Sequence, residues 1–268
     1  MKDNPIVYKA NLLINASFSM TLNEKRLLLA AISQIPDPRK PISRDDEFTI
    51  TAVYFSRLFK LKNVNNAYLE ISEAATSLLS KVVTIEKSDP DNPKLSRTKT
   101  GWVSFADYYD GEGKVVIKFS EKMLPYLSSL TSGCFSKFSI EQISKLKSVY
   151  AIRLFELLIS EAWKNQDYEI EISRLKYIFD IHDEYERLYD FKRYILEPSL
   201  KSINEHTDCK VTYTQRKNGR EVVSFIFKYS ITTPDKPQRI TRELIEKHAR
   251  PGESYEQVRL RLSKPKLK

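Results

Sequence analysis

The chain contains an internal repeat with a spacing of about 120 residues, which constrains the fold more than any other feature of the sequence. Each copy begins with apolar side chains at helical spacing, over residues 21–33 and 148–160. Thr21 and Glu24 have the spacing of a capping box, which predicts that the first helix begins there. The apolar stripes of the two predicted helices are Leu27, Leu28, Ala31 and Ile32 in the first copy and Ile152, Phe155, Leu158 and Ile159 in the second.

The next segments of the two copies also correspond. Residues 48–59 and 168–179 both alternate like a strand and then change to the spacing of a helix. A longer predicted helix follows in each copy, over residues 65–80 and 190–205.

Each copy then continues into a predicted hairpin, whose first strand begins Lys-Val at Lys81 and at Lys210. In the second copy the turn is Lys-Asn-Gly-Arg at residues 217–220, and Asn-Gly between alternating runs strongly favours a hairpin. The first copy has a longer connection over residues 89–99 and a further turn at residues 110–113.

The order helix, strand, helix, helix, hairpin is that of a winged helix-turn-helix. We therefore predict an α+β protein with two tandem winged helix-turn-helix domains, at residues 1–130 and 131–234, and a basic C-terminal tail at residues 235–268. Short helices over residues 122–126 and 139–146 are expected to join the two copies. The alternative is that two α+β domains share this coarse order by chance.

The net charge of +9 favours a polyanionic partner, because each phosphate contact by Lys or Arg releases a counterion. Residues 236–268 alone hold ten Lys or Arg and four Glu, so we expect the tail to add nonspecific affinity for DNA. The tail also has two segments that could form short helices, over residues 240–248 and 254–262.

The remaining composition indicates a reduced, cytoplasmic protein. Cys134 and Cys209 lie far apart in the sequence and near no pattern of metal ligands. A single disulfide between them is the alternative. No apolar run is long enough to span a membrane, and the first residues do not have the pattern of a secretory signal. We expect no cofactor, no metal and no membrane partner.

A winged helix-turn-helix reads bases with the first residues of its second helix, which enters the major groove. In the second copy Asp190 is placed to cap this helix, and Lys192 and Arg193 then point outward on its first turn. Arg193 suits a guanine base and Lys192 a phosphate, with Lys201 as a weaker candidate; the alternative is a solvated surface pair. Pro198 indicates either a kink or a later start of this helix.

The second hairpin also carries basic residues, namely Arg216, Lys217, Arg220 and Lys228. They suit the phosphate backbone beside the reading helix, or they only keep an edge strand soluble.

The first copy differs, because Glu70 and Glu73 on its long helix would repel phosphate. We therefore expect the first domain to touch the DNA backbone or to pair with a second chain. Its basic residues follow the helix, and the DNA-binding candidates among them are Lys94, Arg97 and Lys99.

From NPIVYKANLL at residues 4–13 to about Ser230, the sequence resembles the Rep initiators of iteron-carrying plasmids. The segments LNEKRLLL at 22–29 and SVYAIRLFELL at 148–158 are typical of the family. The most specific part is YDFKRYIL at 189–196, which continues to INEHT at 203–207.

This resemblance implies a protein whose monomers bind directly repeated origin sites, open the duplex locally and recruit the host initiator and helicase. It also implies a homodimer, in equilibrium with the monomer, that represses its own gene. In this family a basic pair at the start of the second reading helix makes the main base contacts, here at Lys192 and Arg193. The first domain usually provides much of the dimer contact.

Three other classes of protein have to be distinguished from a plasmid initiator. An enzyme of the rolling-circle type needs a metal, usually held by His-x-His, and the three histidines here form no such pair; no ATP-binding loop is present either. A winged-helix transcriptional repressor without initiator activity would have the same fold. A nonspecific binder of nucleic acid would show similar affinity for any duplex.

Overall fold

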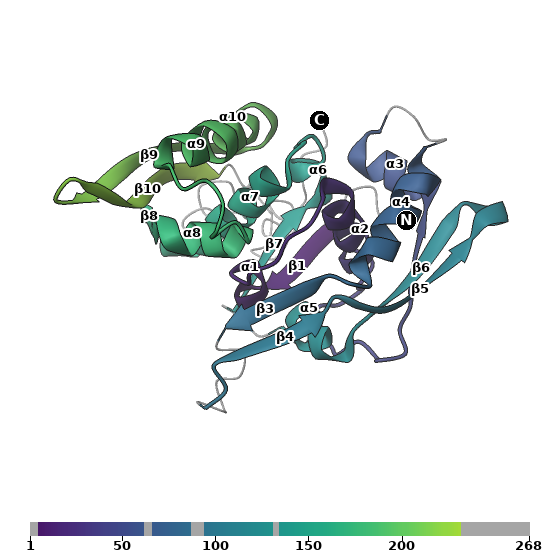
Figure 1. Cartoon of the computed structure of the whole chain (residues 1–268). Helices are drawn as coiled ribbons and strands as arrows, with labels where there is room; N and C mark the ends of the chain where they lie inside the picture. Colours follow the sequence, from purple (N-terminus) through teal and green to yellow (C-terminus); the bar gives the residue numbers. More distant parts are fainter. Residues whose placement is uncertain (1–4, 62–65, 87–93, 131–133, 232–268) are drawn as a thin grey trace, which may run out of the picture. The chain divides into compact units, whose positions relative to one another are not determined.

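The computed structural model describes residues 5–61, 66–86, 94–130 and 134–231 (Figure 1). The helices predicted over residues 240–248 and 254–262 lie outside the described residues. Within the described ranges, no helix has the length and apolar character needed to cross a membrane.

The first repeat copy folds as a winged-helix unit. Its helices and first strand follow in the predicted order, as α2 (Leu22–Ile32), β2 (Phe48–Thr51), α3 (Ala52–Phe59) and α4 (Ala67–Leu78). The wing is the antiparallel hairpin of β5 (Val103–Tyr109) and β6 (Lys114–Phe119). Strand β2 pairs with β6, which gives the sheet order β2-β6-β5.

A separate hairpin, made of β3 (Val82–Glu86) and β4 (Arg97–Gly101), comes between α4 and this wing. The Lys-Val segment at Lys81 therefore leads into a two-stranded sheet of its own. Its expected counterpart after Lys210 belongs instead to a three-stranded sheet, so the two Lys-Val strands are not equivalent in topology.

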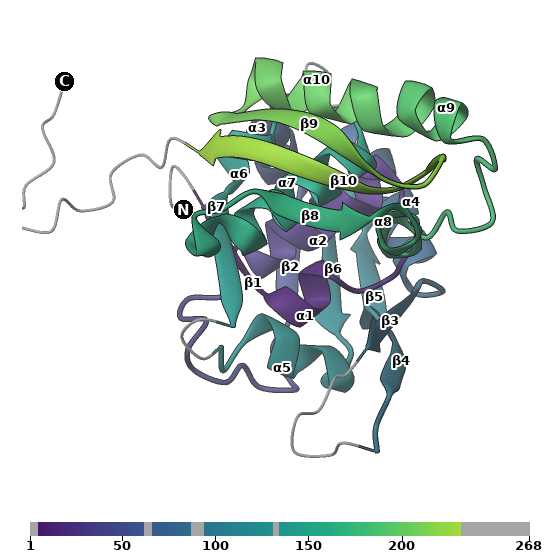
Figure 2. The ribbon, with the colours of Figure 1, turned by 90° about the vertical axis from the view of Figure 1, so that its left-hand side faces the viewer.

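The second copy has the same arrangement without the inserted hairpin. Its elements are α7 (Val149–Glu161), β8 (Tyr168–Glu171), α8 (Ile172–Phe179), α9 (Leu188–Phe191), α10 (Glu197–His206), β9 (Cys209–Asn218) and β10 (Glu221–Ile231). The sheet order is β8-β10-β9, which corresponds strand by strand to β2-β6-β5. Figure 2 shows α9 and α10 running beside the β9–β10 hairpin.

The hairpin predicted at residues 217–220 is present, with its turn one residue later than an Asn-Gly turn. Asn218 pairs with Glu221, so Gly219 and Arg220 form the two-residue turn. Gly219 has φ +60°, a conformation that glycine adopts without steric penalty. A bulge between Val222 and Ser224 follows.

The remaining elements join the copies. Strand β1 (Ile6–Ala10) pairs with β7 (Phe135–Ser139), although the two are far apart in sequence. The short helices are α1 (Asn11–Ile14), α5 (Leu124–Leu127) and α6 (Ile140–Ile143). The helices predicted over residues 122–126 and 139–146 are thus present as shorter elements.

The reading helix of the second copy differs from the prediction in two respects, namely where it begins and how it winds before Pro198. It begins at Leu188, with Arg187 at the N-cap and no side-chain cap, so the prediction that Asp190 caps it is wrong. The buried side chain of Phe191 anchors this first turn instead. Asp190 lies within the first turn, where its charge is favourable to the helix dipole.

A π-helical turn, Lys192–Leu196, connects α9 to α10 and explains how the helix tolerates Pro198. Proline has no N–H and its ring clashes with the carbonyl four residues earlier in a regular helix. The wider π-turn changes the hydrogen bonding just before Pro198, which then lies in the first turn of α10. The chain therefore continues as one helix through residue 206.

The capping box at Thr21 and Glu24 is present, with both of its hydrogen bonds. However, α2 is buried on more than the apolar face that its sequence pattern predicts. Lys25 and Arg26, on the side expected to face solvent, are also buried.

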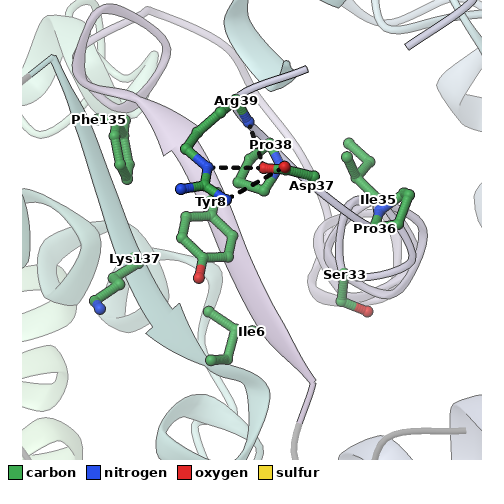
Figure 3. Close-up of a pocket in the computed structure, with 10 residues that line it drawn as sticks. All are labelled: Ile6, Tyr8, Ser33, Ile35, Pro36, Asp37, Pro38, Arg39, Phe135 and Lys137. Atoms are coloured by element: carbon green, nitrogen blue, oxygen red, sulfur yellow. Dashed lines mark hydrogen bonds and ion pairs between the residues drawn. The ribbon is translucent and has the colours of Figure 1, made fainter. Parts of the chain in front are cut away.

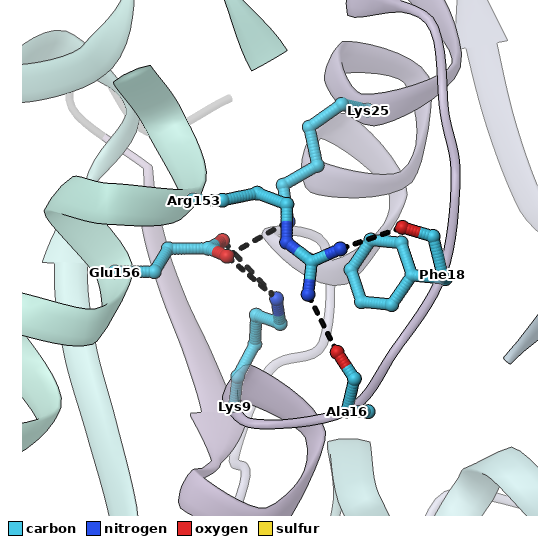
Figure 4. Close-up of polar contacts among 6 residues, drawn as sticks. All are labelled: Lys9, Ala16, Phe18, Lys25, Arg153 and Glu156. Carbon is cyan, nitrogen blue, oxygen red and sulfur yellow. Dashed lines mark hydrogen bonds and ion pairs between the residues drawn. The ribbon is translucent and has the colours of Figure 1, made fainter. Parts of the chain in front are cut away.

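Lys25 belongs to a buried charge cluster that ties the N-terminal segment to α7 (Figure 4). The Glu156 carboxylate accepts hydrogen bonds from the Lys9 ammonium at 3.1 Å and the Lys25 ammonium at 2.8 Å. All three side chains are at most 2% exposed. The Glu156 carboxylate thereby links β1 and α2 to α7.

Arg153, one turn before Glu156, extends the buried charge cluster. Its guanidinium donates to the carbonyl oxygens of Ala16 and Phe18, at 2.6 and 2.7 Å, and lies 3.5 Å from the centre of the Phe18 ring. The segment between α1 and α2 is therefore fixed to α7 through its backbone as well as through its lysines.

The cluster has more cations than carboxylates, and the pKa values reflect this. Burial raises the pKa of Glu156, but Lys25 and Lys9 outweigh burial and hold it below its usual value. Burial lowers the pKa of Lys25 well below normal, against the attraction of Glu156. Burial likewise lowers the pKa of Arg153 to about 9. Glu156 is therefore the group whose charge stabilises all the others.

We predict that Glu156→Gln lowers the free energy of unfolding by about 3–5 kcal/mol, because it leaves buried ammonium groups without their counter-charge. Glu205→Gln is the control: it removes the exposed pair with Lys201, at 3.9 Å, and should change stability by less than about 1 kcal/mol. Urea unfolding of both variants measures the difference. Similar small losses for both would contradict the role given to Glu156.

The same contribution should vanish in acid. Because the pKa of folded Glu156 lies below its unfolded value of about 4.3, its stabilisation is complete above that pH and is lost as the pH falls through the folded pKa. The unfolding curves of the wild type and Glu156→Gln should therefore converge as the pH falls below about 4.

Candidate nucleic-acid interface

The two basic residues at the start of the second reading helix differ in their surroundings. Arg193 is exposed on the π-turn, where its guanidinium lies 5.5 Å from the Tyr194 ring and donates to the Tyr189 hydroxyl at 3.5 Å. Lys192 is half-buried, and its ammonium lies 5.9 Å from the Tyr213 ring on β9. The outward position predicted for both thus describes Arg193 better than Lys192.

The turn before the reading helix is held by Lys176 of α8. Its ammonium donates to the carbonyl oxygens of Glu184 at 3.0 Å and Tyr185 at 2.7 Å. Tyr185 itself has φ +54°, which is uncommon for a residue other than glycine. The contacts of Lys176 fix this conformation and, with it, the point where α9 begins.

The reading helix is also fixed to β9. The Asn204 side chain accepts from the Val211 N–H and donates to the Val211 carbonyl, both at 2.8 Å. Tyr213 donates to Glu197 at 3.2 Å. Burial, together with the Glu197 carboxylate, raises the pKa of Tyr213 to about 12, so this phenol stays protonated at neutral pH.

The wing places its basic residues next to the start of this helix. A hollow of about 780 Å³ is lined by Arg220 at the wing tip and by Leu188 at the first turn of α9. Arg216, Lys217 and Arg220 are all exposed. Arg216 forms an ion pair with Glu169 at 2.6 Å, whereas Lys217 and Arg220 form none among the described residues. The last two are therefore available to an anionic partner.

Lys201 lies farther along the helix, exposed and paired with Glu205 at 3.9 Å. Because Glu205 partly neutralises its charge, Lys201 is a weaker candidate for binding DNA than Arg193.

The candidate residues of the first domain form a separate group on the β3–β4 hairpin. Lys94, Arg97 and Lys99 are all exposed. Arg97 lies opposite Glu86, which accepts from Arg174 of α8 at 2.5 Å, so this hairpin borders the second domain. The structure thus brings the candidates together as two groups, one on the reading helix and wing and one on the β3–β4 hairpin.

Helix α4 of the first domain has a different character. Its outward side carries Leu69, which is 60% exposed, and the exposed Glu73. Hydrogen bonds from Tyr68 to Asp110 and between Thr76 and Tyr108 connect this helix to its wing. An apolar and acidic face of this kind suits a protein contact better than phosphate.

A further hollow, of about 630 Å³, lies beside β1 and β7 (Figure 3). Its lining includes Tyr8 and Phe135, whose rings pack 5.9 Å apart. Arg39 at its rim is bound to Asp37 at 3.0 Å, so one cation is already neutralised there. This hollow is less suited to DNA than the wing and reading helix.

Sequence reasoning missed Tyr189 and Tyr194, which are 66% and 57% exposed beside Arg193. Their aromatic character at outward positions of the predicted helix was the available signal. Among the described residues, no group of three or more His, Cys, Asp or Glu side chains is placed to hold a metal.

Comparison with known proteins assigns the chain to a family. Residues 6–159 match a family model described as initiator replication protein, WH1, and residues 171–229 match one described as initiator Rep protein, WH2. The chain belongs to this family of replication initiators. The assignment confirms the predicted family of replication initiators and the two winged-helix domains.

Individual relatives agree with this assignment. A replication initiation protein of Escherichia coli is 23% identical over 232 residues, covering 84% of this chain and 70% of the relative. The PI protein of Escherichia coli is 25% identical over 244 residues, covering 79% of this chain and 78% of the relative. The crystal structure of Pi initiator protein in complex with iteron DNA has a TM-score of 0.73 at 19% identity, covering 88% of this chain and 100% of that one. This last likeness supports the fold.

Proposed function

We propose that this protein initiates replication of a plasmid by binding directly repeated origin sites through its second winged-helix domain. The observation that carries this proposal is that Arg193 is exposed on a helix whose first turn shares a hollow with Arg220 of the wing. The family membership and the iteron DNA bound by the Pi initiator of similar fold support it.

Each part of this interface has a distinct role. A guanidinium can donate two hydrogen bonds to O6 and N7 of guanine, which discriminates against other bases by about 1–3 kcal/mol. We therefore assign base reading to Arg193. Lys192, held over β9, and the wing residues Lys217 and Arg220 bind phosphates, which fixes the position of the protein without reading sequence.

The first domain adds contacts of two kinds. Lys94, Arg97 and Lys99 on the β3–β4 hairpin bind the DNA backbone. The apolar and acidic side of α4, with Leu69 and Glu73, serves the pairing of two chains, so that monomer and homodimer exist in equilibrium.

Further steps follow from the family resemblance. Bound monomers open the duplex and recruit the host initiator and helicase, and dimers repress the gene of this protein. These steps rest on the family rather than on particular residues of the interface.

Footprinting of the DNA that flanks this gene, at physiological salt with excess random competitor, tests the proposal. Protection of direct repeats about two helical turns apart is expected, after which the same fragment is tested for replication. Protection of an inverted repeat alone would favour a transcriptional repressor. Binding without preference over the competitor would overturn sequence-specific recognition.

Arg193→Ala should weaken binding to the cognate repeat about ten- to hundredfold and binding to random DNA much less, because only base contacts specify sequence. Arg193→Lys is the matched control, since it keeps the charge but loses the paired hydrogen bonds, and it should lose most of the preference as well. Fluorescence anisotropy with both DNAs measures this. Equal losses on the two DNAs would remove Arg193 as a base reader.

Arg220→Ala should weaken binding to all sequences and reduce the log–log salt slope by about one, because it removes one phosphate contact. Lys228→Ala is the control: Lys228 lies on the same hairpin but pairs with Asp167 at 3.9 Å, away from the turn. Its slope should change less. An unchanged slope for Arg220→Ala would exclude the wing tip from the interface.

A further inference from the structure

Two exposed tyrosines flank Arg193 on the second reading helix. Tyr189 lies in the first turn of the helix and Tyr194 on the π-turn, and both rings stay largely in solvent, at 66% and 57% exposure. The next aromatic residue of the same helix, Phe191, is fully buried. Two large rings are thus displayed on the segment of the helix that enters a groove.

Both tyrosines contact the arginine between them. The Tyr189 hydroxyl accepts from Arg193 at 3.5 Å, and the Tyr194 ring lies 5.5 Å from the same guanidinium. The two rings and the guanidinium therefore form one surface, in which apolar area lies on both sides of a donor of paired hydrogen bonds.

The Tyr194 side of this surface is packed against other rings. The Tyr194 ring packs against Tyr185 at 6.4 Å, and Tyr185 packs against the buried Phe191 at 6.5 Å. Lys176 binds the carbonyl of Tyr185 and keeps its backbone in the left-handed conformation. A ring fixed in advance loses little conformational freedom on binding, so its contacts contribute more to affinity and specificity.

We propose that Tyr189 and Tyr194 read thymine methyl groups on either side of the guanine bound by Arg193. The 5-methyl group of thymine is the apolar feature of the major groove, and apolar side chains recognise it by contact. The tyrosines also lie in the first two turns of the helix, where base-reading residues are found. The recognised sequence therefore contains thymines close to that guanine. This inference rests on the proposed function.

Replacing thymine by uracil at single positions of the footprinted repeat removes one methyl group and nothing else. For the wild type, one or two of these replacements should weaken binding about three- to tenfold in fluorescence anisotropy. In Tyr189→Ala or Tyr194→Ala, the replacement at the position read by that residue should no longer matter. Tyr189→Phe and Tyr194→Phe keep the ring and should retain the sensitivity.

Tyr109→Ala is the matched control, because Tyr109 is an exposed tyrosine, at 40%, on β5 of the first domain. It should leave the uracil scan unchanged. Since the two reading tyrosines are exposed, their variants should keep the thermal midpoint of the wild type, which separates loss of reading from loss of folding.

Three results would overturn the inference. A wild-type scan without effect at any thymine would do so while leaving sequence-specific binding intact. So would Ala and Phe variants that lose affinity equally for thymine and uracil DNA, because the hydroxyls would then be binding phosphate. A wild type without preference for the repeat over random DNA would overturn the proposed function first, and the inference with it.

Discussion

The rest of this structure depends on the buried ion pairs that the Glu156 carboxylate forms with Lys9 and Lys25. Glu156 lies on α7, the first helix of the second winged-helix unit, yet its partners Lys9 and Lys25 come from β1 and α2 at the other end of the chain. Removing two ammonium groups from water is unfavourable unless a counter-charge meets them. The two winged-helix units therefore share α7 through a contact that tolerates little change.

The positions of the residues proposed to read DNA follow from this arrangement. With α7 fixed, α10 packs against it and Asn204 ties α10 to β9. Lys176 then holds the turn in front of α9, and the wing tip comes to lie across one hollow from Leu188. Arg193 thus obtains its position from a chain of backbone hydrogen bonds and packing contacts rather than from its immediate neighbours.

Much of the fold could be predicted because it depends on local patterns. The capping box at Thr21, the strand-to-helix transitions and the glycine turn at Gly219 need only short-range information, and the repeat supplied their order. Burial of Lys25 could not be predicted, because its partner Glu156 lies 131 residues away. Likewise the left-handed Tyr185 depends on Lys176 and on ring packing, which no short-range pattern encodes. The basic candidates were recognisable by charge, whereas the tyrosines beside Arg193 were marked only by their outward positions on the predicted helix.

The π-turn at Lys192–Leu196 also sets the direction in which Arg193 points. A π-turn accommodates one residue more than an α-turn, and each residue of a regular helix advances by about 100° around the axis. If the same residues wound as a regular α-helix, the preceding segment would be rotated by about that angle relative to the packed side. The direction in which the Arg193 guanidinium points therefore depends on the winding of this turn as well as on the identity of its residues. Under the proposed function, a relative with the same basic pair and the same number of residues but regular winding would present the pair to a different part of the groove.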